Sequence, residues 1–149
     1  MSRFLSILLA LSAASLRADN TYEIEEIPLP DGMVPEISAV AFTPGGSLVV
    51  VNRPGEVWLT RDPAKGPWRR FAFGLHEPLG VLALSENEIY VTQRPELTRL
   101  RDTDDDGSAD RYETVNDDWC VTDTWHEFTF GLRRDRSLLC HSTMAVSRV

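Results

Sequence analysis

The sequence predicts an all-β fold built from a repeated four-stranded unit, and three observations support this. Short runs of alternating apolar residues fill the chain from residue 37 onward, and Gly, Pro, Asn and Asp separate them. These runs lack the 3.6-residue periodicity of an amphipathic helix. In addition, the segment that begins near residue 39 aligns with the segment that begins near residue 80, at an offset of about 41 residues.

This internal repeat predicts the blades of a β-propeller. A repeat of about 40 to 45 residues with four short strands is typical of one blade. A third copy begins at His126, after an acidic insertion at residues 102–110. A meander sheet or sandwich without repeat symmetry is the alternative. The matched positions are Val40 with Val81, the Arg-Pro pair at residues 53–54 with the pair at 94–95, and Glu56 with Glu96.

The expected strands follow one another within each unit. They lie at residues 37–42, 47–52, 56–60 and 68–73 in the first unit and at 78–84, 88–93, 96–101 and 110–115 in the second. Propellers have at least about four blades, whereas this chain is long enough for about two and a half to three. We therefore interpret residues 19–36 as a lead-in, residues 37–132 as a partial propeller, and residues 133–149 as an aberrant or truncated tail without a second strand.

The N-terminus has the pattern of a secretory signal peptide. Arg3 supplies the positive charge, and residues 4–14 form an apolar run that ends in small side chains. As a helix this run would be about 16 Å long, roughly half the thickness of a bilayer core, which is too short to span it. We expect a signal peptide at residues 1–18, with cleavage after Ala14 or Ala18, and a secreted or periplasmic protein that does not span the membrane. A buried N-terminal helix is the alternative.

Composition disfavours one class of partner and leaves the two cysteines with two interpretations. The 23 Asp and Glu residues outnumber the 15 Lys and Arg residues and give a net charge of -8, which opposes binding to a phosphate backbone, so no nucleic-acid partner is expected. An oxidising compartment would permit a disulfide between Cys120 and Cys140. The interpretation as two small buried hydrophobic side chains is better supported, since no redox or zinc spacing involves them.

The most specific motif is an acidic loop with the spacing of an EF-hand calcium loop. Residues 102–113 match the pattern D-x-D-x-D-G-x5-E in full. Calcium takes six to eight oxygen ligands, and Gly107 permits the sharp turn that brings the carboxylates together. The flanking runs are strand-like, so we expect a structural calcium site on a hairpin, with a solvated acidic turn as the alternative. The predicted ligands are Asp102, Asp104, Asp106, the backbone carbonyl of Ser108, Asp110 and Glu113.

Two histidines share a sequence context that predicts a functional position. His76 and His126 are each followed by Glu, and each stands where the innermost strand of a blade begins, near the mouth of a propeller channel. Histidine is also the side chain best suited to proton abstraction near neutral pH. A hydrogen-bonded structural histidine is the competing interpretation. The sequence contains no HExxH motif, nucleophile elbow or glycine-rich phosphate loop.

Three segments, GLHEPLG, YVTQRPELTRLRDTDDDGSADRYETVND and WHEFTFGL, carry a resemblance to a known family. The chain resembles the secreted propellers related to soluble quinoprotein glucose and sorbosone dehydrogenases, in particular the exported proteins of the membrane-bound dehydrogenase domain group. The resemblance covers about residues 36–132. It implies a six-bladed propeller, pyrroloquinoline quinone and calcium as cofactors, oxidation of a sugar or other alcohol by hydride transfer, and a cytochrome c electron acceptor.

The same resemblance implies roles for individual residues. His126 matches the position of the base that removes the substrate hydroxyl proton, and His76 or Glu77 corresponds loosely to a polar cofactor contact. The residues that bind quinone in the family come from later blades. Two functions therefore stay open: the N-terminal part of an exported quinoprotein-like dehydrogenase, inactive as this fragment, or a non-catalytic calcium-stabilised propeller that serves as a carbohydrate-binding or scaffold module of the cell envelope.

Overall fold

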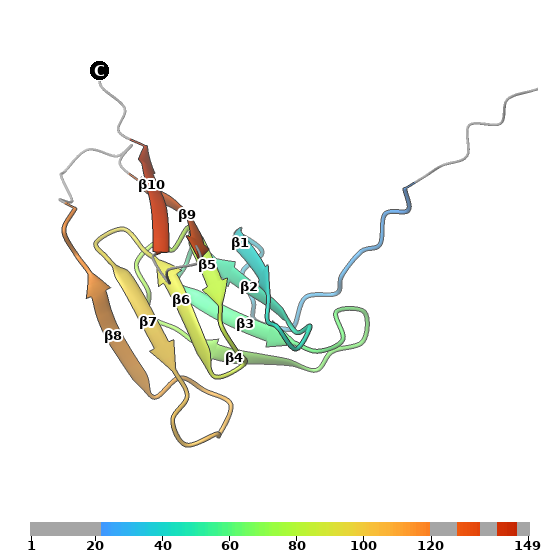
Figure 1. The fold of residues 1–149 in the computed structure, drawn as a ribbon. Coiled ribbons are helices and arrows are strands. Elements are labelled where there is room, and N and C mark those ends of the chain that lie inside the picture. Colours follow the sequence, from blue (N-terminus) through green and yellow to red (C-terminus); the bar gives the residue numbers. More distant parts are fainter. Residues whose placement is uncertain (1–21, 120–127, 135–139, 146–149) are drawn as a thin grey trace, which may run out of the picture.

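The computed structural model describes residues 22–119, 128–134 and 140–145 of the 149-residue chain. These residues form two four-stranded sheets and one two-stranded sheet (Figure 1). The expected signal peptide, Cys120 and His126 lie outside the described residues. The described part of the chain contains no helix long and apolar enough to cross a membrane.

The two four-stranded sheets have the same simple topology. Each is a meander in which strands adjacent in sequence pair antiparallel, in the orders β1-β2-β3-β4 and β5-β6-β7-β8. The all-β prediction is confirmed, and each of the expected strands forms within two residues of its predicted bounds, a common uncertainty at strand ends. The strands are β1 (Ile37–Phe42), β2 (Leu48–Asn52), β3 (Glu56–Thr60), β4 (Trp68–Ala72), β5 (Gly80–Ala83), β6 (Glu88–Thr92), β7 (Leu97–Arg101) and β8 (Arg111–Asn116).

The third sheet corrects one expectation. β9 (Phe128–Arg134) pairs antiparallel with β10 (Cys140–Ala145). The prediction of a tail without a second strand was wrong, because β10 lies within residues 133–149. Its sequence, CHSTMA, lacks the apolar alternation that marks a half-buried strand. Its backbone nevertheless pairs with β9, and ladder pairing does not require that alternation.

The core lies between the two four-stranded sheets. Val49 and Val51 of β2 and Ile89 and Val91 of β6 are completely buried, as expected where every second side chain of a strand faces the opposite sheet. Burying a large apolar side chain of this kind stabilises a fold by roughly 1.5–3 kcal/mol. The other members of the cluster are Val57, Leu59, Phe71, Ala72, Leu75, Val81, Ala83 and Leu100.

The turns after β2 and β6 are equivalent in the two sheets but differ in length. The first turn comprises residues 53–55 and the second residues 93–96. The strands on either side of the turn have the same lengths in the two sheets. Glu56 is the first residue of β3, opposite Asn52, whereas Leu97 takes that place opposite Thr92 in the second sheet. The predicted alignment of Glu56 with Glu96 is therefore one residue off, because the longer turn contains Glu96.

The two ends of the strands carry different candidate sites. Residues 74–79 lie against the turns after β2 and β6, where the backbone N–H of Leu75 donates to the carbonyl of Gly55 (3.1 Å). The loop between β7 and β8 lies at the opposite end, since neighbouring strands run antiparallel, and projects beyond the sheet (Figure 1). The length of the strands therefore separates His76 and Glu77 from the acidic loop.

Candidate metal centre

The acidic loop, defined here as residues 102–110, connects β7 to β8. Asp102 directly follows β7 and is held at the sheet: it is only 6% exposed, and its N–H donates to the carbonyl of Asn87 (3.0 Å). Asp104 and Asp106 are exposed on the turn that follows. Two residues in this turn have positive φ angles, Asp105 at 61° and Gly107 at 95°. Gly and Asp tolerate this left-handed conformation better than most residues do.

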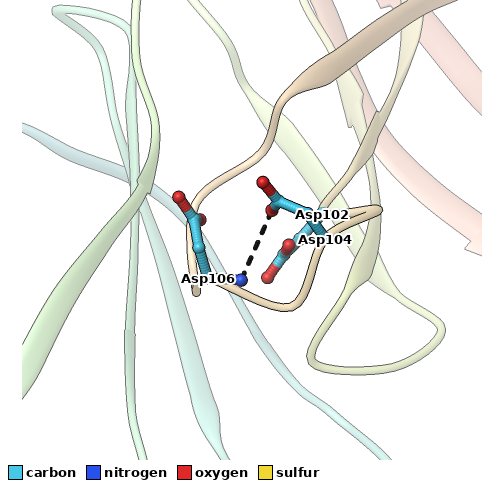
Figure 2. Close-up of side chains that lie close together, drawn as sticks. All are labelled: Asp102, Asp104 and Asp106. Atoms are coloured by element: carbon cyan, nitrogen blue, oxygen red, sulfur yellow. Dashed lines mark hydrogen bonds between the residues drawn. The ribbon is translucent and has the colours of Figure 1, made fainter.

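Three of the predicted ligands converge in this loop. One carboxylate oxygen from each of Asp102, Asp104 and Asp106 lies within 4.8 Å of the other two. Figure 2 shows the three side chains on one turn, with their carboxylates grouped together. Two hydrogen bonds from backbone N–H groups to aspartate side chains two residues earlier, as in Asx-turns, shape the turn. Asp106 N–H donates to Asp104 Oδ1 (3.4 Å), and Ser108 N–H donates to Asp106 Oδ1 (2.8 Å).

The side chain of Asp102 is the most informative group of the cluster. Its Oδ2 accepts a hydrogen bond from the N–H of Gly107 (2.8 Å). Its Oδ1 is buried and has no hydrogen-bond partner among the described residues. Buried polar atoms are nearly always paired, and leaving one unpaired costs about 1–3 kcal/mol. Asp102 thus has an acceptor oxygen to spare and is grouped with two further aspartates that could hold a metal ion with it, since a carboxylate offers only acceptors.

The charges in the loop perturb the pKa of two aspartates. At Asp104 a hydrogen bond from the N–H of Asp106 lowers the pKa. Four other effects together outweigh it and raise the pKa: the negative charge of Asp106, desolvation, the negative charge of Asp110 and the adjacent carboxyl of Asp102. The net result is a pKa above the ordinary value, as expected for crowded like charges. Hydrogen bonds from the hydroxyl and N–H of Thr103 lower the pKa of Asp110.

The structure does not bring Glu113 into this cluster. Both of its oxygens accept bonds from Arg101 (3.0 Å each), and it forms further ion pairs with Arg99 (3.6 Å) and Arg111 (3.0 Å). The cause is the strand: Glu113 lies in β8 opposite Arg99, so its side chain stands on the sheet instead of turning back to the loop. In an EF-hand, a helix places the last ligand.

Asp110 is also engaged elsewhere within the loop. Its Oδ1 accepts the N–H of Thr103 (2.9 Å), and its Oδ2 accepts the hydroxyl of Thr103 (2.5 Å). These bonds close the base of the loop, together with the bond from the N–H of Asp110 to the carbonyl of Arg101 (3.0 Å). Asp110 therefore holds the two ends of the loop together.

Sequence reasoning did not single out two residues that support the loop. Asn87, in the turn after β5, donates its side-chain amide to Asp105. Arg69 of β4 donates to the carbonyl of Gly107 (2.5 Å). Neither residue belongs to a local motif, and both reach the loop only because the strands and sheets bring distant segments together. No signal short of the three-dimensional arrangement would have identified them.

An open groove of about 450 Å³ lies beside the loop. Asp102, Asp105 and Gly107 form one part of its wall, and Trp68 lines it as well. An ion pair between Arg61 and Glu86 (2.7 Å) belongs to the same groove. The cluster therefore borders a solvent-accessible depression that also contains a tryptophan.

The second predicted site lies at the other end of the sheets. His76 is exposed, and its backbone N–H and carbonyl bond to the Gln93 side chain (2.6 Å) and to the N–H of Arg94 (3.0 Å). Glu77, which has a φ of 44°, forms ion pairs with Arg53 (3.2 Å) and Arg94 (3.3 Å). These two arginines are the ones that the sequence repeat aligns, so the described contacts of Glu77 link the two units to each other.

The comparisons with known proteins found neither a matching family model nor a matching curated protein. The resemblance to quinoprotein dehydrogenases is therefore an interpretation of the sequence, and quinone binding and the role of His126 stay predictions. The chemistry that the described residues present directly is a group of three aspartates able to hold a metal ion.

Proposed function

We propose that the acidic loop binds a calcium ion and that the ion has a structural role, stabilising a non-catalytic scaffold module. The observation that carries this proposal is the buried Oδ1 of Asp102, which has no hydrogen-bond partner within the described ranges of the chain. An exposed acidic turn would hydrate each of its carboxylates, so exposed aspartates alone would support nothing more than a solvated loop. A buried carboxylate is costly unless its charge is paired, and a cation would stabilise one that has oxygens of two further carboxylates within 4.8 Å.

The choice of calcium follows from ligand chemistry. Calcium accepts carboxylate, carbonyl and water oxygens in a flexible shell, whereas magnesium requires a near-ideal octahedron with shorter bonds. Three carboxylates leave several positions for backbone oxygens and water on the exposed side of the loop. We expect a dissociation constant of about 0.1–1 mM, as in extracellular calcium modules. The signal-peptide pattern supports an exported protein, which would meet calcium at such concentrations.

The scaffold that we propose is a β-propeller, with the two four-stranded sheets as consecutive blades. Two observations support it. The sheets have identical strand order and share one core. The same ion pair also recurs in both units at residues that the repeat aligns: Glu36 with Arg53 (2.9 Å) and Glu77 with Arg94 (3.3 Å). Radial repetition of such sheets is the defining feature of propellers.

Substitution of one aspartate tests the calcium site. In the full chain, Asp102→Asn removes a ligand charge and keeps the shape, so we expect the calcium-dependent rise of the melting temperature to disappear. The matched control is Asp117→Asn, which removes the same charge from an exposed aspartate outside the loop and should leave the rise unchanged. A calcium-dependent rise that survives in Asp102→Asn, or that is missing in the unsubstituted chain, would contradict the proposal.

A further inference from the structure

We infer that Arg69 is a positioning residue of the calcium site and that, through Arg69, calcium binding is coupled to the contact between the two four-stranded sheets. This inference rests on the proposed function and extends it. It concerns a residue of the first sheet that acts on a loop of the second sheet.

Arg69 reaches from β4 into the second unit at two points. Its Nη1 donates to the carbonyl of Gly107 in the acidic loop (2.5 Å), and its Nη2 donates to the carbonyl of Glu86 in the turn after β5 (3.0 Å). Arg69 as a whole is half-buried, and its guanidinium lies 5.5 Å from the ring centre of Phe71. Two bonds from one planar group fix its direction, which a flexible lysine would do less well.

Gly107 is the link between Arg69 and the carboxylates. Its N–H donates to Asp102 Oδ2 (2.8 Å), and its carbonyl accepts from Arg69. A side chain at this position would start only 3.0 Å from Arg69 Nη1, and the φ of 95° already favours glycine. The position of Arg69 therefore helps to decide where the Gly107 N–H points and, in turn, how the carboxylate of Asp102 is held.

A second bond between the units lies beside the first. The N–H of Ala109 donates to the carbonyl of Phe71 (2.7 Å), so two residues of the loop are bonded to β4. A cation that orders the carboxylates would also order Gly107 and Ala109. By linkage, contacts that favour the cation-binding shape of the loop and the cation itself must stabilise each other by equal amounts.

The sign of the expected effect separates positioning from simple electrostatics. A positive charge near a cation site weakens binding, so loss of the Arg69 charge would by itself strengthen calcium binding. Loss of positioning has the opposite effect. Arg70, the next residue, is a natural control because its guanidinium bonds to Glu56 (3.1 Å) within its own sheet.

The experiment compares Arg69→Gln with Arg70→Gln in the full chain, using calorimetric calcium titration and melting curves with and without calcium. We expect Arg69→Gln to weaken calcium binding about tenfold and to shrink the calcium-dependent rise in melting temperature, and Arg70→Gln to change neither. If Arg69→Gln lowers both melting curves equally and leaves the affinity unchanged, the inference is overturned and the proposed function stands. If the unsubstituted chain binds no calcium, both fail.

Hydrogen exchange in the unsubstituted chain gives a second test that needs no variant. The amide of Ala109 reports the bond to β4 directly, and calcium should slow its exchange at least about tenfold, because opening this bond would then disturb the bound ion. Slower exchange at Gly107 with no change at Ala109 would mean that the ion orders the loop without tightening the contact between the sheets, contrary to the inference.

Discussion

The same hairpin occurs in both four-stranded sheets with two different loops. Residues 61–67 connect β3 to β4, and residues 102–110 connect β7 to β8. An Arg-Asp pair stands at the end of the third strand in each sheet, at residues 61–62 and 101–102. In the first loop, Asp62 accepts the N–H groups of Ala64 (3.2 Å) and Lys65 (3.3 Å), and Lys65 Nζ lies 4.0 Å from the same carboxylate.

The two loops differ in how the aspartate at the end of the third strand is paired. The first aspartate is satisfied by its own turn and by a lysine. The second aspartate, Asp102, retains a buried oxygen with no hydrogen-bond partner in the described part of the chain, and two of the four further aspartates of the loop, Asp104 and Asp106, lie close to it. The first aspartate is therefore paired within its own loop, whereas the second belongs to a cluster that could hold a metal ion, and we propose that calcium binds there. Three predictions test this contrast.

The largest effect is expected from exchange of the loops. Replacing residues 102–110 by the sequence of residues 62–67 leaves a single aspartate in place of the carboxylate cluster, so the calcium-dependent part of the stability should vanish. At a calcium concentration one hundred times the dissociation constant this part amounts to about 2.7 kcal/mol. Denaturant unfolding with and without calcium measures it. The contrast between the loops would be broken if the exchanged protein still responded to calcium.

A smaller effect is expected from substitution of Glu113. This substitution tests whether calcium binding depends on the loop alone and not on the strand that follows it. Glu113→Gln should lower the free energy of unfolding by about 1 kcal/mol, because it weakens half-buried ion pairs with Arg99 and Arg101 and an exposed one with Arg111. The calcium-dependent rise in melting temperature should be unchanged. Asp104→Asn is the comparison, and it should reduce that rise. Loss of the rise in Glu113→Gln would return this glutamate to the ligand set.

The smallest effect is a pH dependence that belongs to the acidic loop. The pKa of Asp104 is raised above its ordinary value of 3.8, so in the calcium-free protein its protonated form is favoured by folding. Its contribution to stability is present below pH 3.8 and is lost as the pH rises through the folded-state pKa.

Calcium requires the ionised form of Asp104, so calcium affinity should fall as the pH drops through the same interval, with release of a proton on binding. Calorimetric titrations in buffers of different ionisation enthalpy measure that proton. Asp104→Asn provides the control, and its calcium affinity should depend less on pH. An unchanged pH dependence in this variant would assign the titration to another group.

Sequence patterns predicted the strands well because strand formation here depends on local features. Alternating runs such as that of β6 place Ile89 and Val91 on one face, and turns rich in Gly, Pro and Asn end each run. The convergence of Asp102, Asp104 and Asp106 was also predictable, because a turn at Gly107 brings together side chains two residues apart. β10 was missed because its sequence lacks alternation.

The sequence by itself determined the all-β class, the positions of the strands in the two four-stranded sheets and the acidic motif, since these depend on residues close together in the chain. Only the tertiary structure decided that Asp102 keeps a buried oxygen with no hydrogen-bond partner among the described residues, and that Arg69 and Asn87 support the loop. The physical reason is that burial and long-range hydrogen bonds arise when sheets pack. The motif alone placed Glu113 in the loop, but the pairing of β8 with β7 turned it toward three arginines.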